Sequence, residues 1–142
     1  MKVITKSTEE TIKLGEKIAS QIQGGDIILL QGDLGAGKTT FMKGLAQGLN
    51  ISENITSPTF TLMNVYPLKS SNTKQLVHID TYRLKDEQEL IDIGVEDYLG
   101  KPNTICVIEW PEKLPHLLEN KKTTIVALKN INENQREIIV EF

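Results

Sequence analysis

The sequence predicts an α/β fold with a mixed central sheet, helices on the faces of the sheet and a C-terminal β-hairpin. A glycine-rich segment, Gly32–Thr39, stands between a short apolar run at Asp26–Gln31 and a helical pattern at Thr40–Leu49. The apolar run suits a buried parallel strand, so these residues predict a strand–loop–helix unit. Two more apolar runs, Lys74–Asp80 and Thr104–Ile108, predict further strands.

The N-terminal segment predicts an edge strand and a long helix. Val3–Ile4 is a short apolar pair that suits an edge strand. Ser7 and Glu10 have the spacing of a capping box, and apolar residues follow at helical intervals. We therefore expect a helix from about Thr8 to Gln23, ended by the two glycines that follow.

The rest of the chain predicts a loop, two hairpins and short helices. The two hairpins are inferred from strand-like runs separated by polar turns, and Pro115 limits any helix near it to a short one. The expected elements are a polar loop at Asn50–Thr61, a hairpin of Phe60–Leu68 with Lys74–Asp80, one interrupted helix or two short ones over Asp86–Leu99, a short helix at most in Pro111–Asn120, and a terminal hairpin of Lys122–Asn130 with Gln135–Phe142.

Bulk composition limits the classes of function. The 142 residues predict one domain spanning 1–142, with 39% hydrophobic and 25% charged residues. We expect a cytoplasmic protein, because no apolar segment is long enough to span a membrane and the N-terminus lacks a signal core. The single cysteine, Cys106, lies in an apolar run and is expected in the core.

The charge of the chain argues against direct binding of nucleic acid. The net charge is −3 and the pI is about 5.4, whereas a nucleic-acid footprint needs a basic face. The chain has only two arginines, Arg83 and Arg136, and few aromatic residues to stack on bases.

The segment Gly32–Thr39 fits the pattern G-x-x-x-x-G-K-[ST], which is the phosphate-binding loop of P-loop NTPases. Its glycines allow backbone N–H groups to surround phosphates without side chains in the way. Lys38 is expected to reach the β- and γ-phosphates, and the Thr39 hydroxyl to ligate Mg²⁺. The helix that begins near Lys38 directs its positive dipole end at the anion. The predicted fold is therefore a three-layer P-loop NTPase-like domain.

Two acidic residues stand at the ends of predicted strands. Asp80 suits the Walker B position, where it would hold Mg²⁺ directly or through water. Glu109 lies where open α/β sheets build their sites and is expected to ligate Mg²⁺ or orient the attacking water. The neighbouring Trp110 lines the nucleotide pocket or belongs to the core. His78 is interpreted as a hydrogen-bonded strand histidine rather than a catalyst.

The polar loop after the first P-loop helix carries hydroxyl side chains at Ser57, Thr59 and Thr61. In P-loop proteins this region often reaches back to Mg²⁺ and the γ-phosphate as a switch. An ordinary Ser/Pro turn is the alternative interpretation.

Four motifs occur together and in order: Gly-Asp-Leu-Gly-Ala-Gly-Lys-Thr-Thr-Phe at 32–41, Ser-Pro-Thr-Phe at 57–60, His-Ile-Asp-Thr-Tyr-Arg at 78–83 and Ile-Glu-Trp-Pro at 108–111. In this respect the chain closely resembles the TsaE (YjeE) family. The resemblance runs from the first helix to the end of the chain. It implies an ATPase that takes part in the synthesis of tRNA threonylcarbamoyladenosine (t6A). In that pathway the modification is placed on N6 of adenosine 37 in tRNAs that read ANN codons. It also implies a TsaB–TsaD heterodimer as partner, with tRNA reached only through that complex.

The resemblance also implies roles for individual residues. ATP phosphates would be wrapped by Gly35, Ala36, Gly37, Lys38, Thr39 and Thr40, while Thr39, Asp80 and Glu109 would hold Mg²⁺. Thr59 would lie in the switch segment. Adenine would be held by Thr11 at the start of the first helix and by a C-terminal segment. In that segment, Lys129 is the residue expected to contact adenine.

Alternative functions remain open from the residues alone. A small-molecule kinase usually adds an arginine-rich lid and an acceptor site, neither of which is evident here. A nucleotide-dependent conformational switch would use hydrolysis only as a timer. No arginine finger is obvious unless Arg83 serves, so we expect weak ATPase activity alone that the partner changes. A monomer is the simplest expectation for the isolated chain.

Overall fold

The computed structural model describes residues 1–58, 60–70 and 72–142. The strands in this part of the chain are β1 (Lys2–Thr5), β2 (Ile27–Gln31), β3 (Met63–Pro67), β4 (Gln75–Asp80), β5 (Thr104–Glu109), β6 (Thr124–Asn130) and β7 (Arg136–Glu141). The helices are α1 (Thr8–Ala19), α2 (Lys38–Gly48) and α3 (Gln88–Asp92), with short 3₁₀ turns at Val95–Asp97 and Pro111–Lys113.

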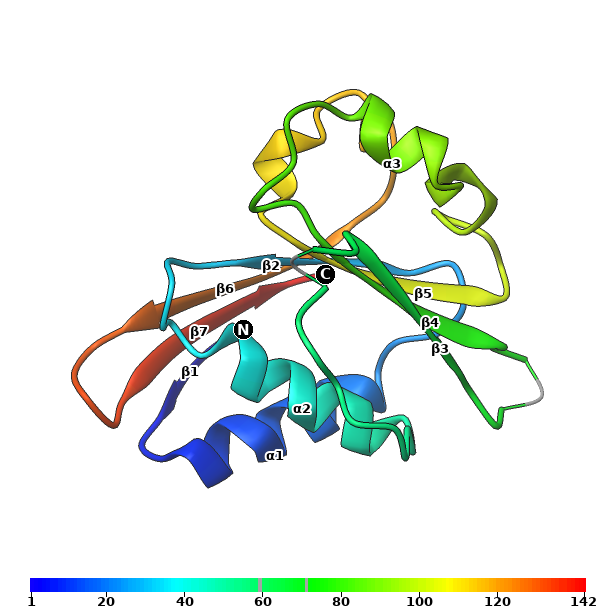
Figure 1. Ribbon diagram of the computed structural model, residues 1–142. Helices are drawn as coiled ribbons and strands as arrows, with labels where there is room; N and C mark the ends of the chain where they lie inside the picture. Colours follow the sequence, from blue (N-terminus) through cyan, green and yellow to red (C-terminus); the bar gives the residue numbers. More distant parts are fainter. Residues whose placement is uncertain (59, 71) are drawn as a thin grey trace.

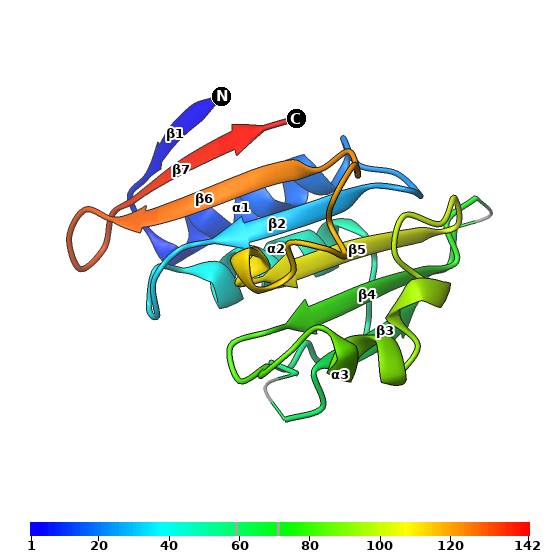
Figure 2. The same cartoon turned by 90° about the horizontal axis from the view of Figure 1, so that it is seen from above.

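The strands form one mixed sheet in the order β1-β7-β6-β2-β5-β4-β3. The four central strands, β6, β2, β5 and β4, are parallel, while β3, β7 and β1 join antiparallel. Helices α1 and α2 cover one face of the sheet, and α3 lies over the other (Figure 1). Viewed from above, the N- and C-terminal strands lie together at one edge (Figure 2). The predicted three-layer α/β class is confirmed.

Burial follows the alternation of side chains along the strands. On one face, Leu76 of β4 and Val107 of β5 pack with Phe41 and Leu45 of α2. On the other face, neighbouring residues of the same strands form a second apolar cluster that packs beneath α3 and the loops around it. Because the central strands are buried on both faces, they read as near-continuous apolar runs in the sequence.

The two helices on the first face cross at a glycine contact. An added Cβ at Gly44 would lie 2.1 Å from the Ile12 carbonyl oxygen, and one at Gly15 would lie 2.6 Å from the Phe41 carbonyl oxygen. Both distances are impossible for real side chains, so the close approach of the helices needs glycine at both positions. This contact fixes α2, whose first residues belong to the site described below.

Several boundaries differ from the prediction. Helix α1 ends at Ala19 rather than near Gln23, with Ser20 as its C-cap, although the side chain of Ile22 is still buried. The apolar pattern therefore continues past the end of the helix. Strand β3 begins at Met63 rather than Phe60. The region 86–99 forms two short helical pieces separated at Gly94, which has a φ of +92°.

Candidate functional site

The glycine-rich loop connects the end of β2 to the start of α2. Gly37 is the N-cap of α2, with a left-handed backbone at φ +100°, and Gly35 has a φ of +80°. An L-residue rarely adopts this conformation, so both positions favour glycine. Ala36 between them is 2% exposed and does not line the pocket, whereas Thr39 and Thr40 lie in the first turn of α2 and do.

Lys38 turns its ammonium group toward the loop and a tryptophan ring. Its Nζ donates a hydrogen bond to the Gly32 carbonyl oxygen at 2.6 Å and lies 3.8 Å from the centroid of the Trp110 ring. Burial lowers the pKa of Lys38, and the negative charges of Glu109 and Asp80 oppose that effect. The charged side chain is thus held at the pocket wall by one carbonyl group and one aromatic face.

The two predicted carboxylates are direct neighbours on adjacent strands. Asp80 and Glu109 are register partners at the ends of β4 and β5, and they are 6% and 8% exposed. The Tyr82 backbone N–H donates to Asp80 Oδ1 at 2.9 Å, and Ser57 Oγ donates to Asp80 Oδ2 at 3.1 Å. Glu109 Oε2 is hydrogen-bonded to His78 Nε2 at 2.8 Å, which makes His78 the hydrogen-bonded strand histidine that was predicted.

Trp110 follows Glu109 in a turn with a positive φ of 58°. The buried hydroxyl of Thr81 donates to the carbonyl oxygens of Glu109 at 3.1 Å and Trp110 at 2.6 Å, which supports this turn. The Trp110 ring also lies 5.2 Å from the ring of Tyr82, centroid to centroid. Of the two sequence-based interpretations of Trp110, the structure supports the pocket wall.

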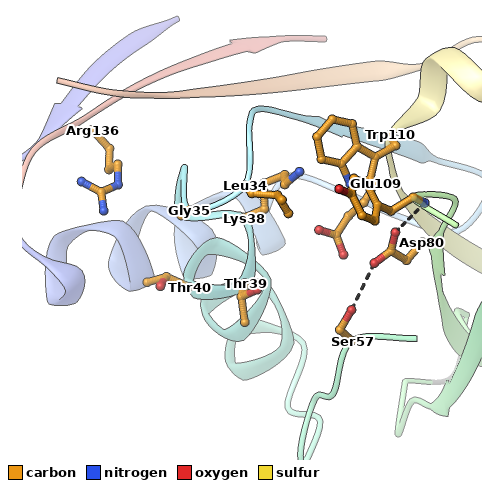
Figure 3. Close-up of a pocket in the computed structure, with 12 residues that line it drawn as sticks. Leu34, Gly35, Lys38, Thr39, Thr40, Ser57, Asp80, Glu109, Trp110 and Arg136 are labelled. Carbon is orange, nitrogen blue, oxygen red and sulfur yellow. Dashed lines mark hydrogen bonds between the residues drawn. The ribbon is translucent and has the colours of Figure 1, made fainter. Parts of the chain in front are cut away.

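These groups line one pocket of about 320 Å³. Figure 3 shows Lys38, Asp80, Glu109 and Trp110 gathered at one end, with Ser57 facing Asp80, and Arg136 at the other end beyond Gly35. The lining residues are Leu34, Gly35, Gly37, Lys38, Thr39, Thr40, Ser57, Asp80, Tyr82, Glu109, Trp110 and Arg136.

A smaller hollow of about 50 Å³ adjoins the pocket and shares Gly37, Thr40 and Arg136 with it. Its other walls are Ser7, Thr8 and Thr11 from the start of α1 and Glu133 and Asn134 from the loop between β6 and β7. Thr11 therefore lies beside the glycine-rich loop, and its hydroxyl is 2.8 Å from the Thr5 hydroxyl.

One predicted adenine contact lies away from both hollows. Lys129 is exposed on β6 and lines neither hollow. Arg136, at the start of β7, comes from the same hairpin and lines both. No motif surrounds Arg136 in the sequence, so only its rarity as one of two arginines could have singled it out. Thr59 lies outside the described residues, and Arg83 is exposed, with its guanidinium 5.0 Å from the Phe60 ring centroid.

The pocket lining includes oxygen ligands that fit Mg²⁺. They are the Thr39 hydroxyl and the carboxylates of Asp80 and Glu109, and hard oxygen ligands of this kind are the ones Mg²⁺ prefers. Among the described residues, no three acidic, histidine or cysteine side chains form a closed metal-binding group. This set suits an ion that takes its remaining ligands from phosphates and water rather than from the protein.

Within the residues that the structure describes, no helix is long and apolar enough to cross a membrane.

Comparison with known proteins gives a consistent result. The sequence profile of the family described as threonylcarbamoyl adenosine biosynthesis protein TsaE matches residues 5–138. The chain belongs to the TsaE family. The tRNA threonylcarbamoyladenosine biosynthesis protein TsaE of Treponema pallidum is 39% identical over 140 residues, which cover 99% of both chains. The Bacillus subtilis protein of the same name is 38% identical, covering 94% of this chain and 80% of its own.

A solved structure supports the fold. The crystal structure of Bacillus subtilis YdiB superposes with a TM-score of 0.74 at 31% sequence identity, covering 97% of this chain and 82% of that one. The resemblance drawn from four short motifs therefore extends to the whole architecture.

Proposed function

We propose that this protein is an Mg²⁺-dependent ATPase that acts in the N6-threonylcarbamoylation of adenosine 37 in tRNAs that read ANN codons. The observation that carries the ATPase part is the single pocket in which Lys38, Thr39 and the paired carboxylates Asp80 and Glu109 meet. The pathway part is supported by membership in the TsaE family, whose relatives are named for tRNA threonylcarbamoyladenosine biosynthesis.

The two hollows suggest how ATP would lie. The triphosphate would rest on the backbone of Gly35–Thr40 at the N-terminus of α2, where the N–H groups of the first helical turn and the helix dipole favour anions. The Ala36 N–H already donates to the Asp33 carbonyl oxygen at 3.0 Å. The nucleoside would extend toward Thr11 and Arg136, because the smaller hollow continues the pocket in that direction. Lys38 would exchange its hydrogen bond to the Gly32 carbonyl for the β- and γ-phosphates.

The carboxylate end would carry the chemistry. Thr39 and Asp80 would hold Mg²⁺, with Glu109 either beside them or on the attacking water. The bound ion would supply charge neutralisation at the phosphates. Glu109 is suited to accept a hydrogen bond from water because it lines the pocket while one oxygen stays bonded to His78.

Hydrolysis by the protein alone is expected to be slow. Of the two arginines, Arg136 lies at the end of the pocket away from Asp80 and Glu109 (Figure 3), and Arg83 is not among the residues that line the pocket. An arginine supplied at the γ-phosphate accelerates P-loop hydrolysis by about 10³–10⁵. We therefore propose that a TsaB–TsaD heterodimer in the cytoplasm changes the rate, and that this acidic protein reaches tRNA only through that pair.

The test is steady-state release of ADP and inorganic phosphate by the purified protein, alone and with a TsaB–TsaD pair from the same organism. Lys38→Ala serves as the blank, because it removes the phosphate-binding charge. Activity that depends on the pair and is lost in the blank supports the proposal. Fast hydrolysis that ignores the pair refutes the proposed role, and transfer of phosphate to a metabolite rather than water indicates a kinase.

A conformational switch is the second candidate, and one contact favours it. Ser57, in the loop after α2, donates a hydrogen bond to Asp80, so the loop touches a proposed Mg²⁺ ligand. Binding of the ion would change that contact and could move the loop. A Glu109→Ala variant that still binds ATP separates the two functions. Threonylcarbamoylation that continues without hydrolysis supports the switch, whereas modification that stalls supports the ATPase.

A further inference from the structure

The buried histidine behind the site has no role in the function described so far. His78 is 2% exposed, in the middle of β4. Its Nε2 is bonded to Glu109 Oε2 across the β4–β5 pair, and its Nδ1 is buried with no hydrogen-bond partner in the described part of the chain. A polar ring in an apolar strand is costly unless its hydrogen bonds are made, so this one needs an explanation.

The surroundings of the ring decide which nitrogen carries the hydrogen. A carboxylate can only accept, so Nε2 must carry the hydrogen if Glu109 is ionised. Placing a hydrogen on Nδ1 instead would bury an N–H donor without an acceptor, which costs about 1–3 kcal/mol. With the hydrogen on Nε2, the ring directs a donor at Glu109 and leaves at Nδ1 only an unpaired acceptor rather than an unpaired donor.

We propose that His78 is a positioning residue for ATP hydrolysis, holding the Glu109 carboxylate in the orientation that its work on water or Mg²⁺ requires. The inference rests on the proposed function. Glu109 has several rotatable bonds and lies at the end of a strand, and among the described residues His78 is the hydrogen-bond partner of its Oε2. A hydrogen bond from behind restricts its rotation, in the way that partners of metal ligands and catalytic bases orient those groups.

His78 would not touch substrate, because the pocket walls include Glu109 but not His78. Loss of the donor should therefore lower kcat and leave the KM for ATP nearly unchanged. Removal of comparable supporting hydrogen bonds costs about 10–100-fold in activity or metal affinity.

Two variants separate the hydrogen bond from the space that the ring fills. His78→Gln places an amide N–H at nearly the reach of Nε2, while His78→Leu fills similar volume with no donor. We expect His78→Leu to lower kcat about 10–100-fold and His78→Gln to restore most of it, with similar thermal midpoints. The second histidine, His116, is exposed, and His116→Gln serves as the control. Equal kcat in the Gln and Leu variants, or a kcat that follows the thermal midpoint, would overturn the inference.

A spectroscopic measurement tests the same point without activity. Long-range ¹H–¹⁵N correlation of the imidazole ring should show His78 protonated at Nε2 and unprotonated at Nδ1 at neutral pH, with a shift of the Nε2 signal in Glu109→Gln. A hydrogen on Nδ1 would refute the positioning role. If the wild-type protein hydrolyses no ATP, the ATPase proposal fails, and this measurement still decides whether His78 holds Glu109.

Discussion

The conformational demand of the proposed phosphate-binding loop, Gly32–Thr39, can be tested at a single glycine. Gly35 has a φ of +80°, is exposed, and an added Cβ there would meet no atom within 4 Å. Gly100 has nearly the same geometry, with a φ of +75° and the same open space, but does not line the pocket. Gly35→Ala and Gly100→Ala therefore carry the same backbone strain, and only the first places a methyl group in the proposed phosphate site.

The stability cost follows from the backbone. An L-residue in the left-handed region costs about 1–2 kcal/mol, and alanine offsets about 0.4–1 kcal/mol of this by restricting the unfolded chain. The net loss is about 1 kcal/mol. An unfolding entropy of about 2.1 cal/mol/K per residue gives about 0.3 kcal/mol/K for a chain of this size, so Tm should fall about 3 °C in both variants.

The effect on nucleotide binding should differ between the two variants. Gly35→Ala crowds the backbone where phosphates approach, so we expect at least about tenfold weaker ATP binding, equivalent to about 1.4 kcal/mol. Gly100→Ala should bind within about twofold of the wild type. Thermal unfolding and isothermal titration with ATP and Mg²⁺ give both quantities. Similar ATP affinity in the two variants would refute the assignment of this loop as the phosphate cradle.

Three further outcomes are expected. Arg136→Ala should raise the KM for ATP about tenfold, the loss of roughly one charged hydrogen bond, whereas Arg83→Ala should leave KM unchanged; equal effects would contradict the pocket lining. Cys106 should react with thiol reagents only after unfolding, because burial raises the pKa of its thiol to about 12. The free energy of unfolding should decline as pH rises from about 9 through about 12, because the thiol ionises in the unfolded chain before it does in the folded one. Rapid labelling of the folded protein at pH 8 would contradict the first expectation. Thr81→Val should lower stability by about 1–3 kcal/mol and alter Trp110 fluorescence, because it removes the hydroxyl that holds the Trp110 turn; an unchanged Tm would contradict that role.

The predictable part of the site is the part that local sequence determines. The strand–loop–helix unit around Lys38 follows from adjacent residues, and each carboxylate directly ends an apolar run. Carboxyl ends of parallel strands share one edge of a sheet, so the sequence is enough to predict that Asp80 and Glu109 lie near the loop. The sequence does not predict that Asp80 and Glu109 face each other directly, because this depends on β4 and β5 being neighbours in the sheet.

The unpredicted part depends on tertiary packing. Arg136 reaches the pocket because β7 pairs with both β6 and β1, which brings the start of β7 beside the start of α1 and the glycine-rich loop. Sequence spacing favours no position in that hairpin over another. In the hairpin register Lys129 faces Glu137 and Asn130 faces Arg136, so a shift of a few positions separates the predicted residue from the one that lines the pocket.

The charges of the pocket place a physical condition on its occupant. Two nearly buried carboxylates stand beside the site where we propose that phosphates bind, opposed by one lysine and the N-terminus of α2. A triphosphate alone would meet repulsion at that end, whereas a divalent cation between the phosphates and the carboxylates turns the repulsion into attraction on both sides. Tight nucleotide binding and Mg²⁺ binding should therefore be coupled at the end of the pocket where hydrolysis would occur.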